Sequence, residues 1–202
     1  MAYPTIEIAL PGWIDAVLTN GNRVYPELSD RMQLVIDLAR RNVDAETGGP
    51  FAAGIFDMQS GRLIAPGVNL VMSTNYSVVH AEIVAMMVAQ RCVGDYDLGA
   101  EGLPPMELVS STEPCAMCFG AVVWSGVRRL VCGARDSDAR AVGFDEGPKP
   151  DDWIGALEAR GISVVRDMGR EPASRVLEHY AEQGGVIYNA RQGASEAGRR
   201  RK

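Results

Sequence analysis

The sequence predicts one α/β domain whose mixed β-sheet is covered by helices on both faces. A length of 202 residues with 47% apolar side chains suits one ordinary globular domain with a sizeable core. A β-hairpin pattern comes early and is followed by alternating helix and strand patterns, which is typical of such a sheet. No repeat or internal linker divides these patterns. We therefore expect a single domain over residues 1–192.

The first predicted elements are a helix and a hairpin. Residues 31–44 carry apolar side chains at nearly one-face helical spacing, and Ser29 or Asp30 is available to cap the start. Residues 51–57 and 63–71 are apolar runs separated by a short polar segment with a glycine, so we expect them to pair as antiparallel strands.

Two nearly all-apolar helices are predicted in the middle of the chain. Residues 80–91 and 115–125 carry apolar side chains on almost every side, which indicates helices buried on most faces. Thr112 is the expected N-cap of the second helix. Residues 106–111 are short and bounded by prolines, so they predict a strand, and residues 129–134 predict another.

The last patterns complete the domain. Residues 152–160, 162–165 and 172–183 predict a helix, a strand and a further helix. Residues 193–202 are rich in Gly, Ser, Glu and Arg, so we expect a disordered basic tail there.

The charge distribution disfavours a long nucleic acid as the substrate. The chain has 20 Lys and Arg against 26 Asp and Glu, and four of the cations stand at the last four positions. Without them 16 cations face 26 carboxyl groups, which leaves a charge of −10 on the rest of the chain. Such a body lacks the basic surface that binds a phosphate backbone, so a small neutral ligand is the better expectation.

The start of the chain lacks the charged and apolar regions of a signal peptide, and its longer uncharged segments contain polar residues. We expect a cytoplasmic protein without a membrane span. In that compartment the closely spaced Cys115 and Cys118 favour a metal site or catalysis over a structural disulfide. Cys92 and Cys132 lie in apolar surroundings and are expected to be buried thiols.

Two short motifs bring metal ligands to the starts of the two apolar helices. His80 and Glu82 form an H-x-E motif, and Cys115 and Cys118 form a C-x-x-C motif. Thiolates at i and i+3 in a first helical turn share one face and are favoured by the positive end of the helix. With His80 they supply three ligands, which leaves the fourth position of a tetrahedral zinc open to water, as in catalytic sites. Glu82 is then the expected proton carrier beside that water.

Each motif alone also fits a simpler structure. A redox disulfide between the two cysteines would leave His80 and Glu82 without a role. His80 alone would fit a hydrogen-bonded core histidine. A structural zinc needs a fourth ligand, and none of the candidates has a short paired spacing; they are His179, Cys92 and Cys132.

The combination of H-x-E with P-C-x-x-C is the signature of zinc-dependent nucleobase deaminases. On these motifs the chain resembles the cytidine deaminase superfamily and, within it, the bacterial guanine deaminases. The resemblance runs through most of the chain. It is carried by Gly49-Pro50-Phe51-Ala52-Ala53, Asn69, the two zinc motifs, Phe119-Gly120-Ala121 and Gly143-Phe144-Asp145-Glu146-Gly147-Pro148.

The resemblance implies a three-layer α/β/α cytidine deaminase-like fold with a five-stranded mixed sheet. It also implies a homodimer, and a free nucleobase bound near a zinc ion at the ends of the two apolar helices. The reaction expected on this basis is hydrolytic deamination of guanine to xanthine and ammonia.

The resemblance also assigns roles to residues outside the zinc motifs. Asn69 is expected to hydrogen-bond the substrate ring, and Phe51 and Trp124 are candidates for pocket walls, with a core position the ordinary alternative. Glu146 is expected to act as a second acid, with Asp145 as its competitor. Tyr188 either closes the pocket or anchors the C-terminal segment.

Other functions remain open at this point. Cytosine, a nucleoside or an aminotriazine such as ammeline would change only the pocket contacts. A tRNA adenosine deaminase shares both zinc motifs, and the basic tail fits it while the acidic body does not. Outside enzymes, a zinc-stabilised binding module would have no use for Glu82.

Overall fold

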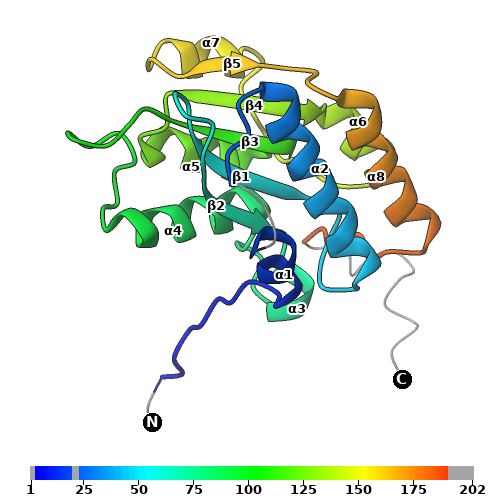
Figure 1. Cartoon of the computed structure of the whole chain (residues 1–202). Helices are drawn as coiled ribbons and strands as arrows, with labels where there is room; N and C mark the ends of the chain where they lie inside the picture. Colours follow the sequence, from blue (N-terminus) through cyan, green and yellow to red (C-terminus); the bar gives the residue numbers. More distant parts are fainter. Residues whose placement is uncertain (1–2, 20–22, 191–202) are drawn as a thin grey trace.

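The structure, a computed structural model, describes residues 3–19 and 23–190. The tail expected at residues 193–202 lies outside the described residues. Figure 1 shows the helices and strands, whose bounds are α1 Trp13–Thr19, α2 Leu28–Asp44, β1 Ala52–Asp57, β2 Leu63–Val68, α3 Val71–Thr74, α4 Ala81–Val93, β3 Met106–Thr112, α5 Ala116–Ser125, β4 Arg129–Ala134, α6 Asp136–Ala141, α7 Trp153–Glu158, β5 Ser163–Val165 and α8 Arg170–Glu182.

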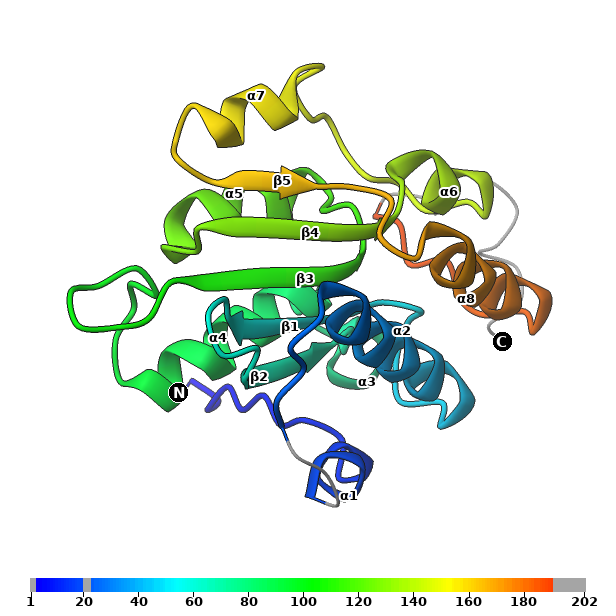
Figure 2. The same ribbon diagram turned by 45° about the horizontal axis from the view of Figure 1, so that its top comes forward.

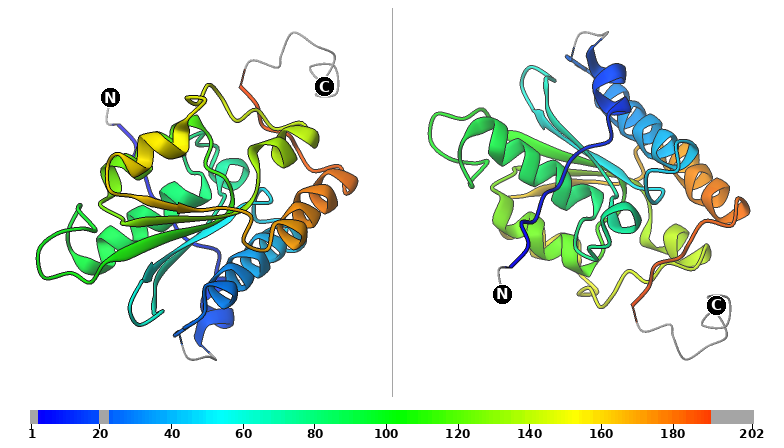
Figure 3. Two further views of the ribbon diagram at one scale, coloured as in Figure 1. Left: turned by 90° about the horizontal axis from the view of Figure 1, so that it is seen from above. Right: turned by 90° about the horizontal axis from the view of Figure 1, so that it is seen from below.

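The strands form one mixed sheet of five strands in the order β2-β1-β3-β4-β5. β1 pairs antiparallel with both β2 and β3, whereas β3, β4 and β5 run parallel. Helices α2 and α8 cover one face of the sheet, and α4 and α5 cover the other, as Figures 2 and 3 show. The expected three-layer fold with a five-stranded mixed sheet is confirmed.

Burial on both faces explains why β1 and β4 are apolar at almost every position, whereas β3 also carries four buried polar residues. Successive side chains of a strand point to opposite faces. Phe56, Val109 and Val131 accordingly belong to the core under α2 and α8, and their neighbours Ile55 and Leu108 belong to the core under α4 and α5. The sheet is therefore enclosed between two helix layers, and one end of it carries the loops described below.

The strand register brings residues that are distant in the sequence to that end of the sheet. Ala52 at the start of β1 pairs with Val68 at the end of β2, and Ala53 pairs with Ser110 near the end of β3. The residues that precede β1 and follow β2 and β3 therefore meet at one end of the sheet. That end holds Phe51, Asn69 and the turn that leads to Cys115.

Several local expectations need correction. β2 ends at Val68, because the Asn69 side chain accepts a hydrogen bond from Val71 N and turns the chain into α3. Helix α2 begins at Leu28, so Ser29 and Asp30 lie inside its first turn and Glu27 takes the N-cap position.

Two further corrections concern α5 and the cysteines. Thr112 is the last residue of β3 and does not cap α5, because two residues intervene and Cys115 takes that position. Cys132 is buried as expected, whereas Cys92 is exposed in the last turn of α4. None of the described helices is long and apolar enough to cross a membrane.

Candidate active site

Helices α4 and α5 begin side by side at the end of the sheet where the strand ends meet. His80 takes the N-cap position of α4, and Cys115 takes that of α5. Gly67 in β2 permits this arrangement, because a Cβ there would lie 2.3 Å from Ala81 O. The first turn of α4 thus packs directly on the sheet, which brings His80 and Glu82 to Cys115.

The side chains of His80, Cys115 and Cys118 form a group that fits one metal ion. Their ligand atoms all lie within 4.8 Å of one another, and His80 Nδ1 is 3.5 Å from Cys115 Sγ. Zinc–sulfur and zinc–nitrogen bonds of about 2.3 and 2.0 Å in a tetrahedron place such atoms roughly 3.5–3.8 Å apart. The donor set and its spacing therefore fit zinc. None of His179, Cys92 or Cys132, the three proposed fourth ligands, joins this group in the part of the chain that the structure describes.

The thiols of Cys115 and Cys118 shift each other's pKa in opposite directions. Cys118 donates a hydrogen bond to Cys115, which lowers the pKa of Cys115 to about 4, with His80 adding to the effect. The same interaction raises the pKa of Cys118 far above its usual value. A divalent cation takes the place of such a proton, because thiolate is the form that binds metal.

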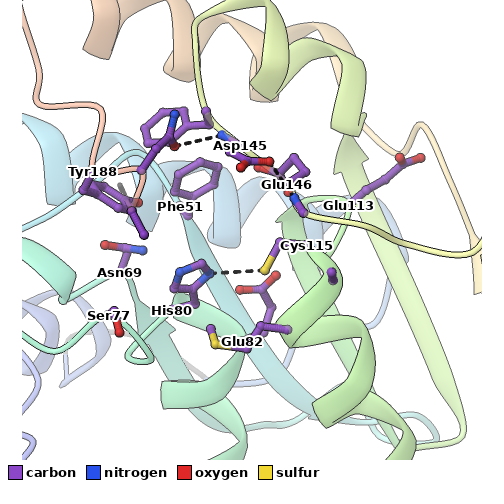
Figure 4. A pocket seen from close by; sticks show the side chains of 16 residues that line it. Phe51, Asn69, Ser77, His80, Glu82, Glu113, Cys115, Asp145, Glu146 and Tyr188 are labelled. Carbon is purple, nitrogen blue, oxygen red and sulfur yellow. Dashed lines mark hydrogen bonds between the residues drawn. The ribbon is translucent and has the colours of Figure 1, made fainter. Parts of the chain in front are cut away.

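Glu82 lies beside the metal group without belonging to it. It stands in the first turn of α4 and is buried, and Figure 4 shows its carboxylate pointing toward Cys115. Burial, followed by the charge of the nearby Cys115, raises the pKa of Glu82 to about 6. A carboxyl group with such a pKa, next to an open metal position, can take up and release a proton near neutral pH.

A cavity of about 370 Å³ opens above the metal group (Figure 4). Aromatic rings form part of its wall: Phe144 lies 4.9 Å from Phe51 and 5.2 Å from Tyr188 between ring centroids. Tyr188 also lies 6.5 Å from the His80 ring, so it closes the cavity from the C-terminal segment. These rings can enclose a flat heterocycle.

Asn69 offers an unused hydrogen-bond donor to this cavity. The residue is buried, and its Oδ1 accepts from Val71 N while its Nδ2 has no partner among the described residues. Asn42 fixes the backbone here, because its Nδ2 donates to Asn69 O and to Gly49 O, both at 2.9 Å. A buried unpartnered amide suits a ligand acceptor.

Glu146 and Asp145 both line the cavity, but their surroundings differ. Glu146 is buried, with 6% of its surface exposed, and burial followed by the charge of Cys115 raises its pKa to about 8. The Asp145 side chain is 66% exposed, and its Oδ1 accepts from Gly147 N at 2.9 Å within the same loop. Of the two, only Glu146 has the buried environment of a proton donor.

Both predicted positions of Trp124 are wrong. Within this chain its side chain is 83% exposed on α5 and lies away from the cavity, so neither the expected wall nor the core position fits. Eight residues that line the cavity were not among the predicted site residues: Ser77, Glu113, Ala116, Met117, Phe144, Gly147, Asn189 and Ala190. The position of Met117 between the two cysteines and that of Asn189 beside Tyr188 indicate that both residues lie near the cavity. Nothing in the local sequence marks Ser77 as a lining residue.

Residues 26–134 match the family described as cytidine and deoxycytidylate deaminase zinc-binding region. The match spans more than half of the chain, and the metal group lies inside it. The chain belongs to this family, and zinc is its cofactor.

Individual proteins give a closer comparison. Guanine deaminase from Nitrosomonas europaea superposes with a TM-score of 0.84 at 48% identity, covering 90% of this chain and 99% of that chain. A homologous chain solved in complex with 2,6-diaminopurine has a TM-score of 0.84 and 51% identity, covering 92% and 97%. Guanine deaminase of Bacillus subtilis (strain 168) is 36% identical over 115 residues, which cover 57% of this chain and 69% of that protein.

Proposed function

We propose that the protein hydrolyses guanine to xanthine and ammonia. The observation that carries this proposal is a zinc-ligand group with Glu82 beside it, at the base of an aromatic-walled cavity. The likeness to guanine deaminase over nine tenths of the chain supports guanine over other bases.

The chemistry follows from the groups in the cavity. Zinc at this position supplies Lewis-acid activation of a water molecule, whose pKa it lowers toward neutrality. Glu82 accepts a proton from the attacking water and delivers it to the ring nitrogen beside the amino-bearing carbon. A carbon–oxygen bond forms at that carbon, and the carbon–nitrogen bond to the amino group then breaks. The amino group leaves as ammonia after it has gained a proton, and the proton that the new hydroxyl group loses as it becomes the carbonyl group returns to the acid that supplied it.

Glu146 is the proposed source of that last proton. Its burial and raised pKa favour the protonated form that an acid needs. The free Nδ2 of Asn69 is proposed to donate to a ring acceptor, and Phe51 and Tyr188 to hold the ring plane. Asp145 is assigned to loop structure instead.

Ammonia release across a panel of substrates tests the function. We expect the highest kcat/KM for guanine, compared with cytosine, adenine, guanosine and ammeline. A higher value for cytosine or a nucleoside would contradict the proposal. Deamination of a tRNA anticodon stem-loop, with binding that weakens as salt rises, would instead support the tRNA-editing alternative.

Two variants separate the acidic residues of the loop. Glu146→Gln is expected to lower kcat by about 10²-fold or more, because the amide cannot give its proton to the leaving amine. Asp145→Asn keeps an acceptor for Gly147 N and is expected to leave kcat near the wild-type value. Steady-state kinetics with zinc analysis checks both variants.

A change confined to KM in Glu146→Gln would make this residue a binding group. Loss of kcat in Asp145→Asn with no loss in Glu146→Gln would reverse the assignment.

Exposed apolar side chains on α5 support the homodimer that the resemblance implies. This helix has no charged residue, and two of its large apolar side chains, Met117 and Trp124, are exposed. Met87 is also exposed on the neighbouring α4. Exposed apolar patches of this kind mark interfaces. We propose that a second copy of the chain covers this face.

Sedimentation velocity tests the dimer. The wild type is expected to sediment as a dimer and Trp124→Glu as a monomer, because a charge would be placed in the apolar interface. Tyr96→Glu is the matched control, since Tyr96 is also 83% exposed but lies outside both helices. A monomeric wild type, or equal dissociation of both variants, would count against this face.

A further inference from the structure

Lys149 is a buried cation close to the active site that the reaction as described does not use. Its side chain is only 7% exposed, and Nζ donates to Pro114 O at 2.8 Å. Nζ also lies 3.0 Å from Asp136 Oδ2 and 5.1 Å from the centroid of the Trp153 ring. A carbonyl, a carboxylate and an aromatic face therefore surround one ammonium group.

The choice of lysine here is unusual for this chain. Of its 20 Lys and Arg residues, 18 are arginines, and the other lysine is Lys202 at the C-terminus. An ammonium is a compact charge with three donors, whereas a guanidinium is planar and wider. Pro148 and Pro150 flank Lys149 and restrict the backbone that presents it.

The segment from Glu146 to Lys149 contacts the chain on both sides of the zinc ligand Cys115. On one side, Lys149 Nζ donates to Pro114 O. On the other side, Ala116 N donates to Glu146 O at 2.8 Å. These two contacts form a clamp that fixes the backbone of Glu146 relative to Cys115.

We propose that Lys149 is a positioning residue that holds the Glu146 carboxyl group in place over the zinc site. This inference rests on the proposed function, because it concerns the proton that Glu146 donates. Lys149 does not touch the substrate, since it does not line the cavity. Its ammonium fixes the loop that carries the acid, and small displacements of a catalytic group cost large factors in rate.

Lys149→Met removes the charge and keeps most of the side-chain length. We expect kcat to fall by roughly 10–10²-fold, with KM and zinc content near the wild-type values. Lys149→Arg keeps the charge in a wider group and is expected to lose kcat as well, which covers the case that Lys149→Met folds poorly. Arg175→Met on α8 is the control, because Arg175 is an exposed cation paired with Glu171.

A double-mutant cycle distinguishes positioning from general support of the fold. If Lys149 acts through Glu146, Lys149→Met will cause no further loss of kcat in a Glu146→Gln background. Independent, multiplicative losses in the double variant would overturn the proposal. Wild-type kcat in both Lys149→Met and Lys149→Arg would overturn it too.

Hydrogen exchange tests the clamp without any need for activity. In Lys149→Met, peptides that cover residues 114–119 and 144–149 are expected to exchange faster than in the wild type, with no such change in Arg175→Met. Unchanged exchange in these peptides would contradict the proposed clamp. Faster exchange in a protein that does not deaminate guanine would contradict the proposed function and leave the clamp standing.

Discussion

Glu82→Gln is expected to lower kcat by about 10²–10⁴-fold while zinc content stays at the wild-type level. The amide has nearly the same shape as the carboxyl group, but it cannot accept a proton from water and pass it to the ring. Zinc should remain because Glu82 lies outside the group formed by His80, Cys115 and Cys118. Ammonia release and metal analysis on the same preparation measure both quantities.

The control for this variant is Glu178→Gln, which makes the same chemical change at an exposed position on α8. It is expected to keep wild-type kcat. A Glu82→Gln protein that retained a substantial fraction of the activity would require another proton carrier. A variant that lost its zinc would make Glu82 a supporting group for the metal instead.

The main helices and all five strands could be predicted from the sequence because burial leaves a periodic record. β1 and β4 are largely apolar runs, β3 is a short segment bounded by prolines, and α2 carries one apolar face. Helices α1, α3 and α6 were not predicted, because a few residues give too little periodicity. Their bounds depend on particular hydrogen bonds, such as the one that Asn69 Oδ1 accepts from Val71 N at the start of α3.

Trp124 and Cys92 show where an apolar pattern fails. The pattern over residues 115–125 correctly predicted a helix, but it does not state what covers each face. Trp124 is exposed in this chain although it belongs to an almost wholly apolar helix. Sequence cannot separate burial inside one chain from burial against another, because both require the same apolar side chains.

The metal ligands were predictable because short spacings place them on two helix starts. The rest of the site depends on the fold. Tyr188 reaches His80 from the far end of the chain, and only the sheet register places Asn69 next to Phe51. The preference for Glu146 over Asp145 required the exposure of each side chain, which adjacent residues in a loop do not reveal.

Cys115→Ala is expected to abolish both zinc binding and deamination. The variant leaves two protein ligands where a catalytic zinc site has three, so the affinity for zinc falls sharply. It also removes the partner of His80 Nδ1 and of the Cys118 thiol. Metal analysis after dialysis, together with thermal unfolding, should show a zinc-free protein with a lower Tm, because zinc no longer stabilises the folded state.

The matched controls are the two cysteines outside the metal group. Cys92→Ala removes an exposed thiol and is expected to keep zinc, activity and Tm. Cys132→Ala removes a fully buried sulfur that binds no metal, so we expect a lower Tm with zinc retained. This pattern separates loss of packing from loss of a ligand. Full zinc retention in Cys115→Ala, or zinc loss in Cys132→Ala, would show that the metal is held by a different set of residues.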